Sequence, residues 1–204
     1  MKKITPELSE ILGLLCAEGH YSIHYFDYWG TDRGRQRFYK NHKSEHIEFY
    51  NKDIKLLKHF QKLLNKEFDY YPKITKHGKI NICRRDIIRK IINYTPLGHL
   101  KWRVPKEIIE SNNSIKIAFL RGYFDGDGTV SNRIRFFSTN IIGLRKVSII
   151  LNSLEIKHTL PKPILKYNRK PLHYIQVSEK EKERFLKIIK PVSKRLGTHL
   201  RGLR

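Results

Sequence analysis

The sequence predicts an α+β protein built from two similar halves, each with the order α–β–β–α–β–β–α. Two observations predict this duplication. The 204-residue chain contains two related nine-residue stretches, ILGLLCAEG at residues 11–19 and LRGYFDGDG at residues 120–128, and similar elements follow both in the same order. A third observation indicates a partner. The formal net charge is +23, from 42 Lys plus Arg against 19 Asp plus Glu, and such a surplus is typical of proteins that bind a polyanion, most often nucleic acid.

The remaining composition argues against a membrane or exported protein. No apolar run approaches the ~20 residues that span a bilayer, and no signal-like apolar segment follows Met1. Cys16 and Cys83 do not form a metal-binding spacing, so we expect both to be reduced, buried thiols. These features predict an intracellular protein that does not contact membranes, in a prokaryotic cytoplasm or an organelle.

The first half begins with a helix that Thr5 caps, with Pro6 in its first turn and Gly19 at its end. The aromatic and β-branched residues that follow predict a strand. The elements expected are this strand at 20–29, a turn at 30–34, strands at 35–40 and 46–50, an amphipathic helix at 54–65, a hairpin of 70–75 and 79–83 around 76–78, and a helix at 86–93.

The second half repeats this order after a connector at residues 94–111, which carries two prolines and Gly98. Asn112, Asn113 or Ser114 caps the helix that contains the second nine-residue stretch. The elements expected after it are a strand within 130–137, an amphipathic helix at 142–154, a hairpin of 160–166 and 173–178, and a helix at 179–190. We therefore divide the chain into a half at 1–95, a linker at 96–111 and a half at 112–204.

The two halves also align outside the repeated stretches. Residues 47–49 (IEF) match residues 134–136 (IRF), and the apolar positions of the following helices match at the same offset. The first half is longer by roughly twenty residues between its nine-residue stretch and its second helix. That extra length is rich in Arg, Lys and His. One repeated helix per half, strands next to each helix and the cationic surplus predict two sheets that face a nucleic acid.

Small residues within the two stretches predict how the halves meet. Gly13 and Ala17 lie four residues apart, as do Gly122 and Gly126, so each pair shares one face of its helix. Small residues on a helix face allow two helix backbones to approach closely. The sequence therefore predicts that the two helices pack together at the centre of a pseudo-two-fold molecule.

This packing predicts a metal site. It brings Glu18 and Asp127 side by side at the C-terminal ends of both helices, where two carboxylates repel each other and the helix dipoles. A divalent cation offsets that repulsion, and oxygen ligands favour Mg²⁺ or a similar ion. We expect the carbonyl groups of Ala17 and Gly126 to complete the protein's share of the ligands, and the bound ion to activate water and stabilise the leaving oxygen of a phosphodiester.

Strand alternation predicts which side chains face nucleic acid. In residues 133–136 the apolar side chains should face the helices, and Arg133 and Arg135 should face outward. Arginine and glutamine suit the edges of guanine and adenine in the major groove, whereas loop residues are better placed for phosphates. The predicted contacts are Arg33, Arg35, Arg37, Lys40, Lys76, His77, Lys79, Asn81, Arg133, Arg135, Arg169, Lys170, Tyr174 and Gln176.

The paired stretches resemble the signature of the LAGLIDADG homing endonucleases, in the monomeric form with two motifs. The resemblance covers nearly the whole chain, and the second motif is the more specific copy. It implies a monomeric enzyme that binds a long, asymmetric duplex DNA site through two saddle-shaped sheets. It further implies that both strands are cut across the minor groove, leaving short 3′ overhangs, with Mg²⁺ or Mn²⁺ as cofactor and with Ca²⁺ binding without supporting cleavage.

The resemblance also implies roles for particular residues. Glu18 and Asp127 stand at the position whose acid holds metal, although the first copy has Glu for the usual Asp. Lys52, together with Asn51, occupies the place of the family's auxiliary group near the scissile phosphate. The second half has the sequence STN at residues 138–140 there, without a lysine, so Arg133 or Arg135 is the candidate substitute.

Other interpretations of the same residues remain open. The fold could serve an RNA-binding intron-splicing maturase, with intron RNA as a partner, or a non-cleaving DNA-binding regulator. A free enzyme encoded in an intron fits the sequence better than an intein. Asp125 is expected to be a helix-end or solvent-side acid and not a ligand, and Lys52 could be a plain surface lysine. We expect Trp29 and Trp102 to be packing residues and not base-stacking platforms.

Overall fold

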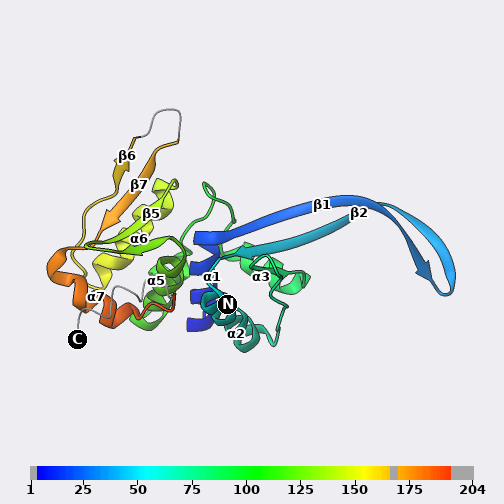
Figure 1. The fold of residues 1–204 in the computed structure, drawn as a ribbon, viewed down its shortest axis with the longest axis horizontal. Coiled ribbons are helices and arrows are strands. Elements are labelled where there is room, and N and C mark those ends of the chain that lie inside the picture. The colour runs from blue at the N-terminus through cyan, green and yellow to red at the C-terminus, as the bar shows by residue number, and fades with distance from the viewer. Residues whose placement is uncertain (1–3, 166–169, 194–204) are drawn as a thin grey trace.

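Two helices of similar length lie against each other at the centre of the molecule, with one sheet on either side (Figure 1). The computed structural model describes residues 4–165 and 170–193. The central helices are α1, Pro6–Glu18, and α5, Asn113–Asp127. Thr5 caps α1 by accepting a hydrogen bond from the Leu8 amide at 3.1 Å, and Asn112 caps α5 in the same way. No helix among the described residues is long and apolar enough to cross a membrane.

The N-terminal half contains a three-stranded antiparallel sheet with the order β1-β2-β3. Its strands are β1, Gly19–Asp32, β2, Arg35–Tyr50, and β3, Lys79–Ile82. Two helices, α2 at Ile54–Phe68 and α3 at Arg85–Tyr94, cover one face. Alternate strand residues on that face, Ile47, Phe49, Ile80 and Ile82, are fully buried. No helix among the described residues covers the other face of the sheet, which we call the open face.

The longest element is a two-stranded ribbon that projects from the body (Figure 1). The prediction of separate strands at 35–40 and 46–50 was wrong, because β2 continues through both. The predicted turn at 30–34 narrows to Arg33 and Gly34, whose φ angles of 47° and 80° are typical of a two-residue hairpin turn. Near its middle a bulge interrupts the pairing, where Asn41, with φ of 51°, donates its amide to the Asp27 carboxylate at 2.8 Å.

The predicted hairpin of residues 70–75 and 79–83 was only half right. Lys79–Ile82 forms β3, but residues 70–75 contribute a single bridge between Ile74 and Ile80. Pro72 lies within this segment and lacks an amide to donate, while its carbonyl accepts a hydrogen bond from the Gln61 side chain at 2.7 Å. The first sheet therefore has three strands and not four.

The C-terminal half repeats the arrangement with shorter strands, in the order β4-β5-β7-β6. The strands are β4, Gly128–Val130, β5, Ile134–Ser138, β6, Lys162–Ile164, and β7, Leu172–Gln176. The helices are α6, Ile141–Ser153, and α7, Lys182–Ile189, which follows a short 3-10 turn, η1, at Glu179–Glu181. The strand expected within 130–137 is β5, and β4 pairs with it in a hairpin that was not expected.

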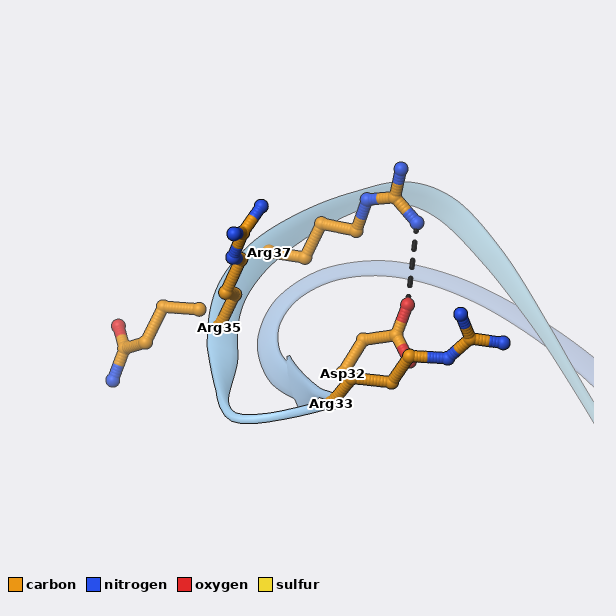
Figure 2. Close-up of a pocket in the computed structure, with 5 residues that line it drawn as sticks. Asp32, Arg33, Arg35 and Arg37 are labelled. Atoms are coloured by element: carbon orange, nitrogen blue, oxygen red, sulfur yellow. Dashed lines mark hydrogen bonds and ion pairs between the residues drawn. The ribbon is translucent and has the colours of Figure 1, made fainter.

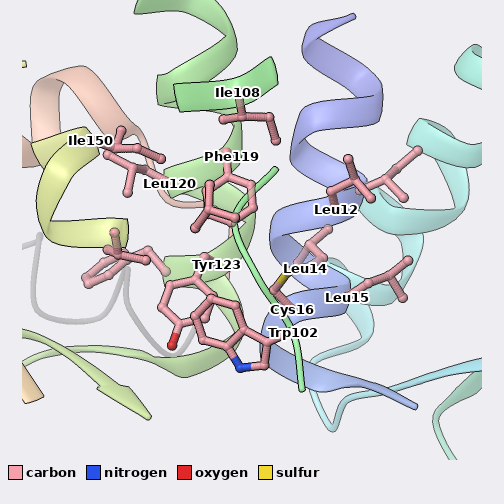
Figure 3. Close-up of a cluster of buried hydrophobic side chains, with 14 of the residues drawn as sticks. Leu12, Leu14, Leu15, Cys16, Trp102, Ile108, Phe119, Leu120, Tyr123 and Ile150 are labelled. Carbon is pink, nitrogen blue, oxygen red and sulfur yellow. The ribbon is translucent and has the colours of Figure 1, made fainter. Parts of the chain in front are cut away.

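The connector between the halves is part of the core. It contains a short helix, α4, at Lys106–Ile109, and its Trp102 is 1% exposed. Trp102 packs against the Tyr123 ring, with centroids 5.0 Å apart, beside a cluster of apolar side chains from α1 and α5 (Figure 3). The packing role expected for Trp102 is therefore confirmed.

Trp29 packs against the Phe38 ring, with centroids 5.1 Å apart, but it is 67% exposed because it lies on the projecting ribbon. The expectation that both cysteines are buried was wrong for one of them. Cys83 is exposed because it follows the end of β3 at the surface, whereas Cys16 is buried as expected.

Candidate active site and nucleic-acid interface

The two central helices meet at glycines, with almost no space between their backbones. A Cβ atom added to Gly13 would lie 2.2 Å from the Phe119 carbonyl oxygen, and one added to Gly122 would lie 2.2 Å from the Glu10 carbonyl oxygen. A Cβ at Gly126 would lie 2.3 Å from the Cβ of Ala17. Because two of these contacts are with backbone, a larger side chain cannot be accommodated by a rotamer change. The helices must separate to admit one.

Both helices end at an acidic residue. Glu18 is the last residue of α1 and Asp127 the last of α5, and β1 and β4 begin at the next residue, a glycine in each case. A Cβ at Gly126 would lie 3.2 Å from Cγ of Glu18, so the Glu18 side chain rests against the end of the opposite helix. Both acids are partly exposed, and both lie at the negative end of a helix dipole.

The charge of Asp127 acts across the interface between the halves. Burial is the main cause that raises the pKa of the Cys16 thiol, and the negative charge of Asp127 raises it further. The same two causes raise the pKa of Tyr123, whose hydroxyl donates to the Phe137 carbonyl at 2.9 Å. The Asp127 carboxylate therefore lies close to Cys16 on the opposite helix, which is two residues before Glu18.

The chemistry of the donor set at this place fits a magnesium-like ion. Two carboxylates and the carbonyls of Ala17 and Gly126 are hard oxygen donors. Among the residues the structure describes, no third His, Cys, Asp or Glu joins them in a cluster. Mg²⁺ is commonly held by one or two carboxylates and otherwise by water and substrate phosphates, so a set of this size suits an ion shared with a nucleic acid. It does not suit an ion held by protein ligands alone.

Of the two positions expected for Asp125, the helix end is confirmed, because it lies in the last turn of α5, and the solvent side is wrong. Its side chain is fully buried, and its carboxylate accepts hydrogen bonds from the amides of Val192 at 2.9 Å and Ser193 at 2.9 Å. Burial raises its pKa to about 6, against the opposing effect of these two amides. The Ser193 hydroxyl donates in turn to Asp53 at 2.9 Å. Asp125 thus fastens the segment after α7 to α5 and, through Ser193, to the N-terminal half.

A buried ion-pair network also joins the two halves. The sequence reasoning missed this network. The Glu10 carboxylate, 5% exposed, lies 3.0 Å from Arg121 of α5 and 2.6 Å from His59 of α2. Arg121 also donates to the Ile189 carbonyl at 2.7 Å. An acid inside the apolar run of α1 was the available signal, because a buried carboxylate needs a partner.

A model of the LAGLIDADG-like domain matches residues 114–190. The chain carries a LAGLIDADG-like domain. The homing endonuclease I-DmoI, solved in complex with DNA and Ca, superposes with a TM-score of 0.66 over 98% of this chain and 100% of its own, at 17% identity. I-SmaMI, bound to an uncleaved DNA target with calcium ions, gives a TM-score of 0.57 over 97% and 89% at 14% identity. The whole chain therefore has the LAGLIDADG homing endonuclease fold.

The same fold occurs outside these nucleases, and sequence relatives are larger proteins. The N-terminal LAGLIDADG domain of DUF199/WhiA superposes with a TM-score of 0.51 over 93% of this chain and 86% of its own, at 16% identity. DNA polymerases from Thermococcus kodakarensis and Methanocaldococcus jannaschii are 25% and 29% identical over 163 and 161 residues, which are 76% and 74% of this chain. The matched segments are only 8% and 9% of those polymerases, a share too small to carry their activity.

Beside α1, four of the predicted residues come together. Gly19 pairs with Phe49, so the end of β2 lies next to the end of α1. The residues just after β2 border a pocket of about 310 Å³, and its lining includes Asn51, Lys52, Lys76 and His77. The Asn51 side-chain oxygen accepts the Asp53 amide at 2.8 Å, which fixes the turn, while Lys52 is exposed.

The corresponding place in the second half is occupied by structural hydrogen bonds. Gly128 pairs with Phe136 as Gly19 does with Phe49. The buried Asn140 caps α6 by accepting the Gly143 amide at 3.0 Å, and its side-chain nitrogen donates to the Trp102 carbonyl at 2.7 Å. The LAGLIDADG-like half therefore offers no basic group at this turn.

The outward alternation expected of the strands holds at several predicted contacts. Arg135 donates to the Gln176 side chain at 3.1 Å and lies over the Tyr174 ring, 5.1 Å from its centroid. These three side chains therefore form one patch on one face of the second sheet, which we call the open face of that sheet. Their strand neighbours Ile134, Phe136 and Ile175 are buried on the other side. Lys79 and Asn81 alternate in the same way with the buried Ile80 and Ile82.

The remaining predicted contacts are more scattered. Arg133 and Lys170 are exposed outside the strands, and Arg169 lies outside the described residues. Lys40 is exposed next to the ribbon bulge. At the ribbon tip, Arg33, Arg35 and Arg37 line a pocket of about 610 Å³ with Asp32 and Gln36, and Arg37 pairs with Asp32 at 3.3 Å (Figure 2). The predicted contacts thus lie in four places, namely on each of the two sheets, in the pocket beside α1 and at the distant tip of the ribbon.

Proposed function

We propose that this protein is a site-specific DNA endonuclease that hydrolyses phosphodiester bonds with a divalent metal ion. The observation that carries the proposal is the pair of acids, one at the end of each central helix, held together by helix contacts that leave no room for a Cβ. A basic pocket beside α1 and basic, open sheet faces accompany it. I-DmoI and I-SmaMI, which share the fold, are bound to DNA in the solved structures.

Each group has a distinct role in the proposed reaction. Glu18 and Asp127 hold the cation, with the carbonyls of Ala17 and Gly126 beside them. The ion, when bound, supplies a water of lowered pKa and neutralises charge on the phosphate. Lys52 stabilises negative charge on the phosphate next to the N-terminal half, and Asn51 positions it by fixing the turn. The open faces of the two sheets hold the duplex across the helix ends.

The finer features of the proposal are the product and the origin of the gene. We propose that each half directs cleavage of one strand, across the minor groove, and leaves short 3′ overhangs. We also propose that the protein is a monomer and that an intron encodes it. Its target is then the joined exon sequence without the intron.

The direct experiment uses purified protein and the intron-less allele of the gene that harbours it. We expect a double-strand break with Mg²⁺ or Mn²⁺, no cleavage with EDTA, and binding without cleavage with Ca²⁺. Sequencing of the ends tests the overhangs. Retarded migration of the duplex without any break in Mg²⁺ or Mn²⁺ would instead identify a non-cleaving regulator.

A second candidate function is assistance to RNA splicing, favoured by the size of the cationic surplus. The net charge is +23, and a surplus of this size attracts polyanions other than duplex DNA as well. Addition of the protein to the intron transcript tests this role. A splicing rate that is unchanged at physiological salt excludes it.

A further inference from the structure

The C-terminal half has a hydroxyl group where the N-terminal half has a lysine. The strand next to each helix-end acid, β2 in one half and β5 in the other, is followed by a short turn. Lys52 lies three residues beyond Phe49, the partner of the glycine after α1, and Thr139 lies three residues beyond Phe136, the partner of the glycine after α5. Because both strands of a duplex carry the same phosphate charge, we expect a cation from another source beside Thr139.

The two arginines expected to substitute for this lysine lie elsewhere. Arg135 is bound to the Gln176 side chain at 3.1 Å and lies over the Tyr174 ring, on the open face of the second sheet. Arg133 precedes β5, whereas Thr139 follows the end of that strand, so the five residues of β5 separate the two. Neither arginine therefore occupies the place that Lys52 has in the first half.

The connector between the halves reaches this place. We call its residues 96–102 the connector loop, which is the green loop between the two sheets in Figure 1. The Thr139 hydroxyl donates to the His99 carbonyl at 3.3 Å, and the Asn140 side chain donates to the Trp102 carbonyl at 2.7 Å. The turn after β5 is therefore fastened to the connector loop at two points.

The connector loop also borders the ends of both central helices. Trp102 packs against Tyr123, which lies one turn before Asp127 in α5 (Figure 3). Just before the loop, the buried Thr95 lies beside Cys16 of α1. Burial raises the pKa of the Cys16 thiol, and a hydrogen bond with the Thr95 side chain opposes this effect. The loop thus passes from the end of α1 to the end of α5, beside the paired acids.

Hydrogen bonds within the connector loop fix its backbone. The Thr95 hydroxyl accepts the Arg103 amide at 2.9 Å and closes the base of the loop. Gly98, with φ of 117°, allows the turn, and its carbonyl accepts the amides of Lys101 at 2.9 Å and Trp102 at 3.3 Å. The Arg103 guanidinium donates to the carbonyls of the same two residues, both at 2.9 Å. The backbone of Lys101 is therefore held next to the turn after β5.

The side chain of Lys101, in contrast, is exposed. Among the described residues no acidic side chain pairs with it, whereas Lys106, in the same connector, lies 3.5 Å from Glu110. An ammonium group on a flexible four-carbon stem binds phosphate as a point charge. Lys101 therefore has the charge and the freedom that a phosphate ligand requires, at the place where the C-terminal half has no basic group of its own.

We propose that Lys101 is a catalytic residue of the C-terminal half, supplied by the connector. Its ammonium group contacts the scissile phosphate beside Asp127 and stabilises negative charge there, as Lys52 does at the phosphate beside Glu18. The two halves of the duplicated fold thus obtain the same group from different elements, a strand end in one and the connector loop in the other. The inference rests on the proposed function and assigns one lysine to each strand of the target.

The experiment follows the two strands separately. The full-length protein is incubated in Mg²⁺ with a duplex of the joined exon sequence that carries a different dye on each strand. Lys101→Met should slow cleavage of one strand by about 10²-fold or more, the effect of losing one group that stabilises transition-state charge, and a nicked duplex should accumulate. Lys52→Met should slow the other strand. Lys101→Arg keeps the charge and should recover most of the rate.

The matched control is Lys106→Met, at another exposed lysine of the connector, which should leave the cleavage of both strands unchanged. Binding in Ca²⁺ gives a readout that does not depend on cleavage. Lys101→Met should reduce the slope of log affinity against log salt by about 1, because one phosphate contact is lost, and Lys106→Met should not change it.

The outcomes separate this inference from the proposed function. Wild-type cleavage of both strands by Lys101→Met, an unchanged salt slope, or slowing of the same strand by Lys52→Met and Lys101→Met would each overturn the role of Lys101 and leave the endonuclease intact. Slowing of the second strand by Arg133→Met or Arg135→Met, with no effect of Lys101→Met, would return the role to an arginine of the sheet. Failure of the wild-type protein to cut either strand overturns the proposed function itself.

Discussion

At the scale of single residues, the sequence alone predicts that the helix glycines lie at the contact between α1 and α5. The four-residue spacing of Gly122 and Gly126 was enough to predict which face meets the other helix. The spacing could not indicate how small the distance would be. That distance depends on the partner carbonyls of Glu10 and Phe119, which only the packed helices bring into place.

The close contact at Gly122 predicts the effect of a small substitution. Gly122→Ala should destabilise the protein by about 1–3 kcal/mol, because its Cβ would meet the Glu10 carbonyl oxygen, although alanine favours helix by about 1 kcal/mol. Urea unfolding measures the change. The control is Asn65→Ala, at an exposed position of α2, which gains helix propensity without a contact. Equal stability of Gly122→Ala and wild type would contradict the packing.

The role of Asp125 could not be predicted from the sequence, because its partners lie 67 and 68 residues later. Asp125→Ala should cost about 2–3 kcal/mol, because it leaves the amides of Val192 and Ser193 without their acceptor. Asp125→Asn retains one acceptor oxygen and should cost less. Hydrogen exchange at residues 190–193 should accelerate in the alanine variant. Unchanged protection there would show that Asp125 does not hold this segment.

At the scale of elements, local signals predicted the helices better than the strands. Thr5, Asn112 and the apolar spacing placed α1 and α5 within a residue or two, because caps and periodicity act within one turn. Lys40 to Glu45 look like a loop, with polar residues and no alternation. They form strand because β1 pairs with them along its whole length, and cross-strand pairing is invisible in a single segment.

Because the ribbon projects from the body, we expect the two tryptophans to differ in their access to solvent. Trp29 is 67% exposed and Trp102 is 1% exposed, so iodide should quench roughly half of the fluorescence. Trp29→Phe should remove the quenchable part, and Trp102→Phe should remove the protected part. A Trp29 as protected as Trp102 would mean that the ribbon packs against the body in solution.

At the scale of the whole molecule, the duplication made the fold predictable from the sequence, but it did not indicate how the two halves differ. The repeated stretches, the matching apolar positions and the charge were sufficient for the fold and for the two acids. The halves are nevertheless unequal. One has a lysine at the strand end and a long ribbon, and the other has Asn140 fixed in a cap.

The cationic surplus predicts strong salt dependence of binding. If the two open faces neutralise six to ten phosphates, duplex affinity should fall by about 10³ or more between 50 and 200 mM salt. Titration of a labelled target by fluorescence anisotropy measures the slope. A slope near zero would mean that binding does not depend on phosphate contacts and that the sheets are not the interface.

The most direct test of the paired-acid site separates cleavage from binding in charge-removing variants. Glu18→Gln and Asp127→Asn should each reduce cleavage in Mg²⁺ by at least about 10³-fold, as expected when a metal ligand is lost, while binding the same duplex in Ca²⁺ with an affinity near that of the wild-type protein. Glu110→Gln, an exposed acid in the connector, should leave both unchanged. Cleavage at wild-type rates by the Glu18 and Asp127 variants would contradict the account.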